Sequence, residues 1–211
     1  MNIGILGSGE VGRTLGAGFA ARGHDVHLGT RSPDRNELRQ WASDTGASVA
    51  AFDGAAAFGH VLVLATAWDG TENAVRLAGP DHFAGKTVLD ATNPLDFSEG
   101  SLRLAVSGED SSGERVQAWL PEAHVVKCFN TVGAGLMVDP DLPGGPPTMF
   151  IAGNDEHAKK TAAEVLSAFG WEGVDLGGIE MSRHLDALAI IWITHAMRTQ
   201  SRDHAFKLLA G

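Results

Sequence analysis

The order of apolar and polar positions along the first 130 residues predicts strands that alternate with helices. The run Val61-Leu62-Val63-Leu64-Ala65 is apolar at every position, which is typical of a strand covered by helices on both faces. Strands that alternate with helices in this way predict parallel strands joined by right-handed crossovers. The expected strands are 2–6, 25–29, 48–52, 61–65, 86–91 and 124–129, and the expected helices are 10–22, 36–45 and 72–77, with a short Ala-rich helix before residue 61.

The remaining chain continues this pattern and adds a helix near its end. Residues 98–113 are polar and acidic, and we expect a loop there and the start of a helix that reaches Leu120. Residues 139–147 are rich in proline and glycine and are expected to be a loop. The predicted elements are strands at 148–152 and 173–176, helices at 156–169 and 183–197, and a last stretch to Leu209.

These elements predict an α/β fold: a Rossmann-type, doubly wound, mostly parallel sheet with helices on both faces and a C-terminal helical extension. We expect one domain over residues 1–211. Residues 1–130 would form the dinucleotide-binding core, and residues 131–211 a smaller part that completes the substrate pocket and a dimer interface.

Composition limits the possible partners and location. The net charge of −10 argues against nucleic acid or an anionic membrane as a partner, because both need a basic face. The single cysteine, Cys128, excludes a disulfide within the chain and disfavours a metal site. Residues 1–6 lack the features of a signal peptide, and the longest apolar run, 185–197, is too short for a bilayer. We therefore expect a cytoplasmic protein.

A glycine-rich motif stands between the first strand and the first helix. Residues 7–12 match G-x-G-x-x-G in the strand–turn–helix context that a dinucleotide-binding loop requires. In such a loop Gly7 permits a tight turn, Gly9 lets a pyrophosphate approach the backbone, and Gly12 lets the helix pack on the strand. We expect Glu10 to point away from the phosphates. The predicted contacts are Gly7, Ser8, Gly9, Glu10, Val11 and Gly12.

The end of the second strand predicts NADP(H) rather than NAD(H). An NAD enzyme places Asp or Glu there to bind the ribose 2′-hydroxyl, whereas an arginine and hydroxyl groups suit a 2′-phosphate. This chain has Thr30, Arg31 and Ser32, followed by Arg35. We interpret Asp34 as the N-cap of the next helix. The alternative is that the two arginines are surface charges without a ligand.

Two further strand ends are expected near the nicotinamide, because ligands of open α/β sheets lie beyond the carboxyl ends of the strands. The first carries Trp68, which would wall the nicotinamide pocket or, alternatively, pack in the core. The second carries Asn93, a donor to ribose or carboxamide, and Pro94, which stiffens the loop. The predicted contacts are Ala65, Thr66, Ala67, Trp68, Asn93 and Pro94.

We find no convincing acid–base set, so no catalytic residue is assigned. The chain has no tyrosine, which excludes the Tyr-x-x-x-Lys arrangement of short-chain dehydrogenases. Lys127 is expected at a sheet edge or in an ion pair, and His184 and His195 on one face of the last helix. Hydride transfer between two aromatic cofactors requires that the rings be positioned, but it needs little proton transfer by side chains. The lack of an acid–base set agrees with such chemistry.

Five segments in this order carry a family resemblance: the phosphate loop, 30–33, 65–68, 90–94 and 129–133. Together they resemble the NADP oxidoreductases typified by the NADPH-dependent reductase of coenzyme F420, a deazaflavin, in its bacterial branch. The resemblance implies direct hydride transfer between NADPH and the deazaflavin, without a protein acid or base. It also implies a second-substrate pocket completed by helix 183–197 and lined by Asn130, Thr131, Val132, Gly133 and Ala134.

Three hypotheses for function follow. The first is an NADP(H)-dependent oxidoreductase with a flat redox partner, either coenzyme F420 or a flavin. The second is a reductase of a small carbonyl or imine, and the third is a non-catalytic NADPH sensor. The apolar surface of helix 183–197 predicts a homodimer, in which Trp192 and His195 face either a ligand or the other subunit.

Overall fold

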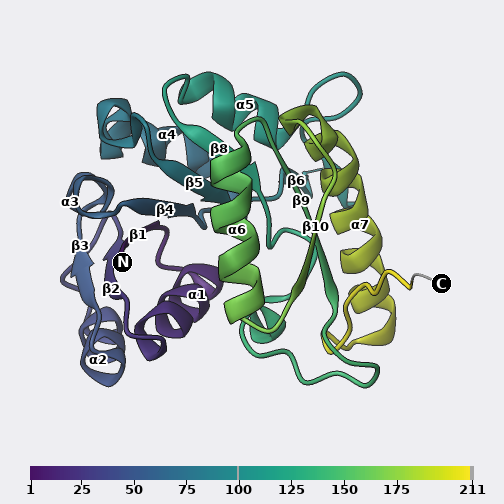
Figure 1. Cartoon of the computed structure of the whole chain (residues 1–211), viewed down its shortest axis with the longest axis horizontal. Coiled ribbons are helices and arrows are strands. Elements are labelled where there is room, and N and C mark those ends of the chain that lie inside the picture. Colours follow the sequence, from purple (N-terminus) through teal and green to yellow (C-terminus); the bar gives the residue numbers. More distant parts are fainter. Residues whose placement is uncertain (99, 210–211) are drawn as a thin grey trace.

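A computed structural model describes residues 1–98 and 100–209 (Figure 1). Eight strands form one sheet in the order β10-β9-β8-β5-β4-β1-β2-β3. The pairings are parallel, except that β9 runs antiparallel to β8. The strands of this sheet are β1 (Asn2–Leu6), β2 (Asp25–Gly29), β3 (Ser48–Ala50), β4 (Val61–Leu64), β5 (Thr87–Asp90), β8 (His124–Lys127), β9 (Thr148–Gly153) and β10 (Glu172–Asp175). The predicted Rossmann-like α/β fold is confirmed.

Helices cover both faces of the sheet because neighbouring strand residues point to opposite sides. Ile5, Val63 and Leu89 belong to the core on the side of α1, α2 and α6. Leu6, Leu64 and Val88 belong to the core on the side of α3, α4 and α5. The helices are α1 (Glu10–Ala21), α2 (Asn36–Thr45), α3 (Phe52–Phe58), α4 (Trp68–Ala78), α5 (Ser112–Trp119), α6 (Glu156–Ala168) and α7 (Ser182–Thr199), with short 3₁₀ turns at Pro80–Phe83, Ala134–Leu136 and Ile179–Met181.

Several boundaries differ from the sequence prediction by one or two residues, and three differences are larger or of another kind. The strand expected over 48–52 ends at Ala50, and Phe52 already begins α3. Helix α4 begins at Trp68 rather than at residue 72, because the turn after β4 leads directly into it. The polar segment after residue 94 contains an unpredicted hairpin of β6 (Leu95–Asp96) and β7 (Arg103–Leu104), whose strands are too short and polar for a periodic signal.

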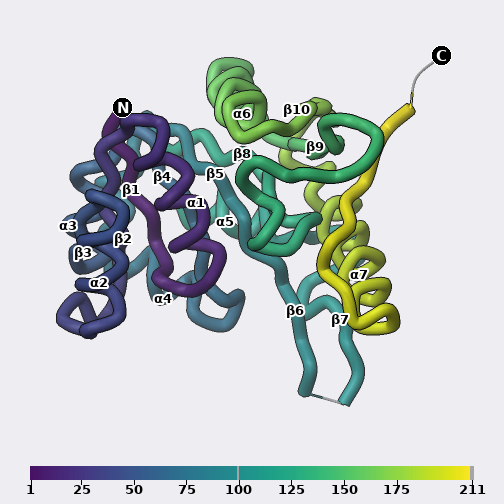
Figure 2. Tube along the Cα trace, turned by 90° about the horizontal axis from the view of Figure 1, so that it is seen from below, coloured from purple at the N-terminus to yellow at the C-terminus, as the bar shows by residue number. Residues whose placement is uncertain are grey.

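The C-terminal part lies at the end of the sheet opposite to α2 and α3 (Figure 1). Helix α7 runs beside the β6–β7 hairpin, which projects from the body of the molecule (Figure 2). Residues 200–209, which follow α7, are not helical. They return to β9, where the backbone N–H of Thr148 donates to the carbonyl oxygen of Phe206 at 2.8 Å. In the described part of the chain, none of the helices has the length and apolar character needed to cross a bilayer.

Candidate functional site

The phosphate loop connects β1 to α1, and two of its glycines have no room for a side chain. Gly7 has a φ of +126°, and a Cβ there would lie 2.3 Å from the carbonyl oxygen of Ala65. A Cβ on Gly12 would lie 1.9 Å from the carbonyl oxygen of Gly7. A Cβ on Gly9 would meet nothing within 4 Å, so open space lies in front of this residue. No side chain caps the N-terminus of α1, which leaves its first N–H groups directed at that space.

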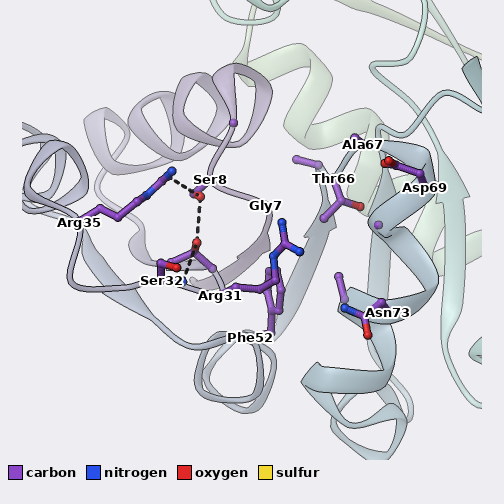
Figure 3. Close-up of a pocket in the computed structure, with 15 residues that line it drawn as sticks. Gly7, Ser8, Arg31, Ser32, Arg35, Phe52, Thr66, Ala67, Asp69 and Asn73 are labelled. Atoms are coloured by element: carbon purple, nitrogen blue, oxygen red, sulfur yellow. Dashed lines mark hydrogen bonds between the residues drawn. The ribbon is translucent and has the colours of Figure 1, made fainter. Parts of the chain in front are cut away.

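A pocket lies in front of this loop, at the carboxyl ends of β1, β2 and β4 (Figure 3). It brings together ten of the sixteen predicted cofactor residues: Gly7, Ser8, Gly9, Thr30, Arg31, Ser32, Arg35, Ala65, Thr66 and Ala67. The other six, which are Glu10, Val11, Gly12, Trp68, Asn93 and Pro94, do not line it.

Polar groups from β1, β2 and α2 meet on one side of the pocket. The Ser8 hydroxyl donates to Thr30 Oγ1 at 3.0 Å, and Arg35 donates to the Ser8 Oγ at 3.2 Å. Arg35 also lies 3.2 Å from Glu37. Within residues 1–98 and 100–209 the Arg31 guanidinium has no hydrogen-bond or ion-pair partner, and it is exposed. This side of the pocket therefore offers cations and hydroxyl groups to an anion.

The interpretation of Asp34 as a helix cap is wrong. Helix α2 has Arg35 at its N-cap, with no side-chain cap hydrogen bond. Asp34 instead accepts from Arg39 at 2.9 Å, on the exposed surface. Its carboxylate is thus occupied by a different arginine from the two that line the pocket.

The opposite side of the pocket is formed by the turn after β4 and by α4 (Figure 3). Thr66 and Thr71 hydroxyls lie 2.9 Å apart and hold this turn against the helix. Sequence reasoning missed Phe52, Asp69 and Asn73, which also line the pocket. Phe52 follows the carboxyl end of β3, so the strand-end rule could have found it. Asp69 and Asn73 lie four residues apart on one face of α4, whose true start the sequence pattern did not reveal.

Trp68 turns toward α5 rather than into the pocket. Its ring stacks on that of Trp119 with centroids 5.5 Å apart, and it packs against the core on that side of the sheet. Of the two alternatives weighed for this residue, the geometry favours packing, and its contact with a nicotinamide stays a prediction.

Asn93 and Asn130 join the ends of β5 and β8. Asn93 Nδ2 donates to the carbonyl oxygen of Asn130 at 2.7 Å, and Asn130 Nδ2 donates to Asn93 Oδ1 at 3.2 Å. Asn130 Nδ2 also lies 3.0 Å from the carbonyl oxygen of Leu185 in α7. Phe129, which precedes this pair, has a φ of +60°, an uncommon conformation for a bulky residue that turns the chain out of the sheet. The two amides therefore connect three segments, and Pro94 beside them is buried.

The segment predicted to line the second-substrate pocket is mostly buried. Asn130, Thr131, Val132 and Ala134 are each 6 % exposed or less. Gly133 alone among the five borders a groove, which it shares with the hairpin, α7 and the chain that follows α7. The groove is lined by Leu95, Gly133, Trp192, Ile193, Ala196, Met197, Gln200 and Arg202.

Apolar side chains from β6 and α7 line most of this groove, together with Gln200 and Arg202, and close packing sets its position. A Cβ on Gly133 would lie 2.8 Å from the Trp192 ring, so the glycine lets the indole pack against this loop. Trp192 donates its Nε1–H to the carbonyl oxygen of His204 at 2.8 Å and stacks on that imidazole. Arg202 lies 3.7 Å from Glu10, which links the groove to the start of α1. Glu10 does not line the phosphate-loop pocket, and its predicted contact with the cofactor stays a prediction.

The titratable residues considered as catalytic candidates line neither the phosphate-loop pocket nor the groove at α7. Lys127 is fully buried in an ion pair with Asp90 at 3.0 Å, as one alternative predicted. The other alternative, a sheet edge, is wrong because β8 lies between β5 and β9. His184 and His195 are both exposed on α7. Burial raises the pKa of the Cys128 thiol, which is therefore a poor nucleophile.

Comparisons with known proteins agree with this geometry. Residues 2–94 match the family model described as NADP oxidoreductase coenzyme F420-dependent. A crystal structure from Arthrobacter sp. FB24, named as a candidate F420-dependent NADP-reductase, is 37% identical with a TM-score of 0.93, and the match covers 100% of both chains.

Two curated relatives are more distant. The F420-dependent NADP reductase of Methanothermobacter thermautotrophicus is 26% identical over 99% of this chain and 94% of its own length. The metalloreductase STEAP3 of Rattus norvegicus is 28% identical over 89% of this chain. This second match spans only 36% of the length of STEAP3.

Proposed function

Because the chain belongs to the family of coenzyme F420-dependent NADP oxidoreductases, we propose that it transfers hydride directly between NADP(H) and a flat redox partner. That partner is a deazaflavin such as coenzyme F420, or a flavin. The observation that carries the proposal is the pocket at β1 and β2, where an anion-binding helix start faces Arg31 and Arg35.

The residues of the pocket fit the phosphates of NADP(H). The open space before Gly9 and the uncapped start of α1 suit a pyrophosphate, since backbone N–H groups and the helix dipole both favour an anion there. Arg31, Arg35 and the hydroxyl of Ser32 would hold the 2′-phosphate. No carboxylate of β2 faces this place, because Asp25 stands at the opposite end of that strand.

The second substrate would lie in the groove between Gly133 and α7. When bound, the nicotinamide supplies or accepts the hydride, and the residues of the chain position the two rings and exclude water. Trp192, Ile193 and Met197 present apolar surface suited to a ring system. In this division, residues 1–130 bind the dinucleotide, and residues 131–211 complete the groove.

The test is NADPH oxidation at 340 nm by the purified protein, with coenzyme F420, FMN and FAD as separate acceptors. Turnover with coenzyme F420 or a flavin, and slower turnover with NADH at equal concentration, is the expected result. Tight NADPH binding with no turnover with these acceptors would contradict hydride transfer to a flat partner. Reduction of a small imine or carbonyl would then support the second hypothesis.

The outer face of α7 supports a homodimer. Ile191 is 60 % exposed and lies outside the groove, although the helix buries its inner face through Leu185, Ala189 and Trp192. A second copy of the chain would cover the exposed apolar surface at Ile191. Light scattering is expected to give twice the monomer mass, and Ile191→Asp is expected to shift it toward the monomer. A monomer at micromolar concentration for the unmodified chain would contradict the dimer.

A further inference from the structure

A cluster of buried charges lies between the sheet, α5 and the first turns of α7, and the proposed hydride transfer does not use it. Asp90 ends β5 and Lys127 ends β8, and the two residues are paired neighbours in the sheet. Their side chains therefore point to the same face, toward α5 and α7. Asp186, in the first turns of α7, lies 3.6 Å from the Lys127 ammonium. All three side chains are at most 1 % exposed.

All three N–H groups of the Lys127 ammonium already donate hydrogen bonds within the protein. Nζ donates to Asp90 Oδ2 at 3.0 Å, to the carbonyl oxygen of Thr92 at 2.5 Å and to Ser112 Oγ at 2.7 Å. An ammonium has three N–H donors, so none remains for a substrate. Lys127 also lines neither the cofactor pocket nor the groove. Its contacts therefore exclude delivery of a proton to the acceptor in this arrangement.

The cluster connects α7 to three other segments. Ser112, the first residue of α5, donates its backbone N–H to Asp186 at 2.8 Å and its hydroxyl to the same carboxylate at 2.7 Å. The Asp90 carboxylate also accepts from the backbone N–H of Thr92, in the loop after β5, at 3.0 Å. Lys127 is the one residue that contacts Asp90, Thr92, Ser112 and Asp186 together.

Apolar packing alone defines the position of α7 poorly. The buried residues of α7 are Ser182, Leu185, Asp186, Ala189 and Trp192, of which two are polar. Apolar contacts are non-directional, whereas buried polar contacts tolerate little displacement because each broken one leaves an unsatisfied group. Trp192 follows Asp186 by six residues, which is about 9 Å along a helix. A displacement of the first turns of α7 thus moves the groove wall.

We propose that Lys127 is a positioning residue for the acceptor site: through Ser112 and Asp186 it holds α7, and with it the groove wall at Trp192 and Ile193, against the sheet end. The inference rests on the proposed function for the identity of the groove. According to this inference, the buried lysine controls the binding of the acceptor but not the binding of the cofactor.

The test compares Lys127→Met with the unmodified protein. The Kd for NADPH, measured by fluorescence, is expected to stay within about twofold, because the cofactor pocket shares no residue with the cluster. The KM for coenzyme F420 or FMN is expected to rise by about tenfold or more, with a smaller change in kcat, because a displaced wall weakens acceptor positioning. Hydrogen exchange of the α7 amides is expected to become faster.

A matched control is Lys159→Met. Lys159 is likewise a buried lysine, 7 % exposed, and it pairs with Glu156 at 2.7 Å and Asp175 at 2.8 Å, in α6 and β10. This variant tests the loss of a buried lysine away from the groove, and its acceptor KM is expected to stay unchanged. Should Lys127→Met fail to fold, Ser112→Ala removes the hydroxyl that joins Lys127 to Asp186 without removing a charge, while the backbone N–H of Ser112 still donates to Asp186. The same changes are expected, at a smaller size.

Unchanged α7 exchange and acceptor KM in the Lys127 and Ser112 variants would overturn the inference, and so would an equal rise in KM in the Lys159 control. Loss of one limb of the pH–rate profile, with α7 exchange unaltered, would make Lys127 a proton donor and also overturn it. If the unmodified protein turns over with no acceptor, the proposed function fails. The exchange measurement then still decides whether Lys127 holds α7.

Discussion

The phosphate-loop pocket and the groove at α7 are built in different ways. The pocket at β1 and β2 is made of short segments next to the phosphate loop, and its charged groups Arg31 and Arg35 are exposed. The groove at α7 combines apolar side chains with Gln200 and Arg202, drawn from distant parts of the chain, and the Lys127–Asp186 pair is buried near the start of the same helix. We propose that charge contacts the cofactor directly in the first region and positions a helix in the second.

The difference follows from what each region is proposed to bind. Phosphates need donors that meet them directly, and exposed arginines retain water until the ligand replaces it. A flat ring needs a wall at a defined distance, and a wall that is a whole helix must be held in place from behind. The comparison can be tested with substitutions that affect one region and spare the other.

The largest effect is expected from Gly12→Ala in the phosphate loop. The new Cβ would overlap the carbonyl oxygen of Gly7, so the loop must deform. The Kd for NADPH is expected to rise by more than about 100-fold, and overpacking should lower the free energy of unfolding by about 1–3 kcal/mol. Titration calorimetry measures the Kd, and thermal unfolding measures the loss of stability.

Gly9→Ala is the matched variant for that experiment. Its Cβ meets no atom of the protein, so the melting temperature is expected to stay constant while NADPH binding weakens. Unchanged NADPH binding in the Gly9 variant would place the pyrophosphate elsewhere.

The next largest effect is expected from Arg31→Asp. It replaces a cation that has no protein partner in the described residues by a carboxylate that repels a 2′-phosphate. Charge-assisted hydrogen bonds contribute about 1.5–3 kcal/mol, so the Kd for NADPH should rise by roughly 10- to 100-fold, with little change for NADH. Arg39→Asp, outside the pocket, serves as the control. Equal losses for both cofactors would contradict the NADP assignment.

A smaller effect, confined to the groove, is expected from Met197→Asp. Met197 is half exposed, so the fold should tolerate the change, but a carboxylate would replace apolar surface of the wall. Loss of about 1 kcal/mol of apolar contact should raise the acceptor KM by about fivefold, with the NADPH Kd unchanged. Leu77→Asp, at an exposed position of α4, is the control. Steady-state kinetics with coenzyme F420 or FMN as the varied substrate checks the result.

The smallest effect is expected from Glu114→Gln, which weakens a second contact between α5 and α7, the ion pair of Glu114 and Arg183. Arg183 donates to both carboxylate oxygens of Glu114, at 2.8 and 2.5 Å, and these bonds hold the pKa of Glu114 below its ordinary value. A lowered carboxyl pKa stabilises the fold above the unfolded pKa, and the contribution disappears as pH falls through the folded pKa. The pair is partly exposed, so it should contribute at most about 1 kcal/mol.

Glu114→Gln is therefore expected to lower stability slightly at pH 7, and the difference should shrink below about pH 4. Urea unfolding at several pH values measures it. A difference that grows on acidification would contradict the assignment. The acceptor KM is expected to change less than in Lys127→Met, because Glu114–Arg183 lies outside the buried cluster.

Most of the parallel sheet and ten of the pocket residues could be predicted, because each signal was local. Apolar runs marked the strands, and the residues after β1, β2 and β4 marked the pocket. Asp69 was missed because α4 starts four residues earlier than its apolar pattern indicated. Asn73 lies in the predicted helix and was missed because the pattern did not show which face of that helix borders the pocket. The buried state of Asn130 and Thr131 was missed because burial at this place depends on α7, more than 50 residues further along the chain.

By itself, the sequence determined the parallel strands, the glycine-rich loop at the start of α1 and the arginines at the end of β2. Each of these depends on neighbouring residues, through backbone geometry, apolar periodicity or charge. Only the tertiary structure decided that Lys127 meets Asp186 across 59 positions, that Trp68 stacks on Trp119 and that Gly133 borders a groove against Trp192. Contacts between distant segments depend on how helices pack on the sheet, and no local pattern encodes that packing.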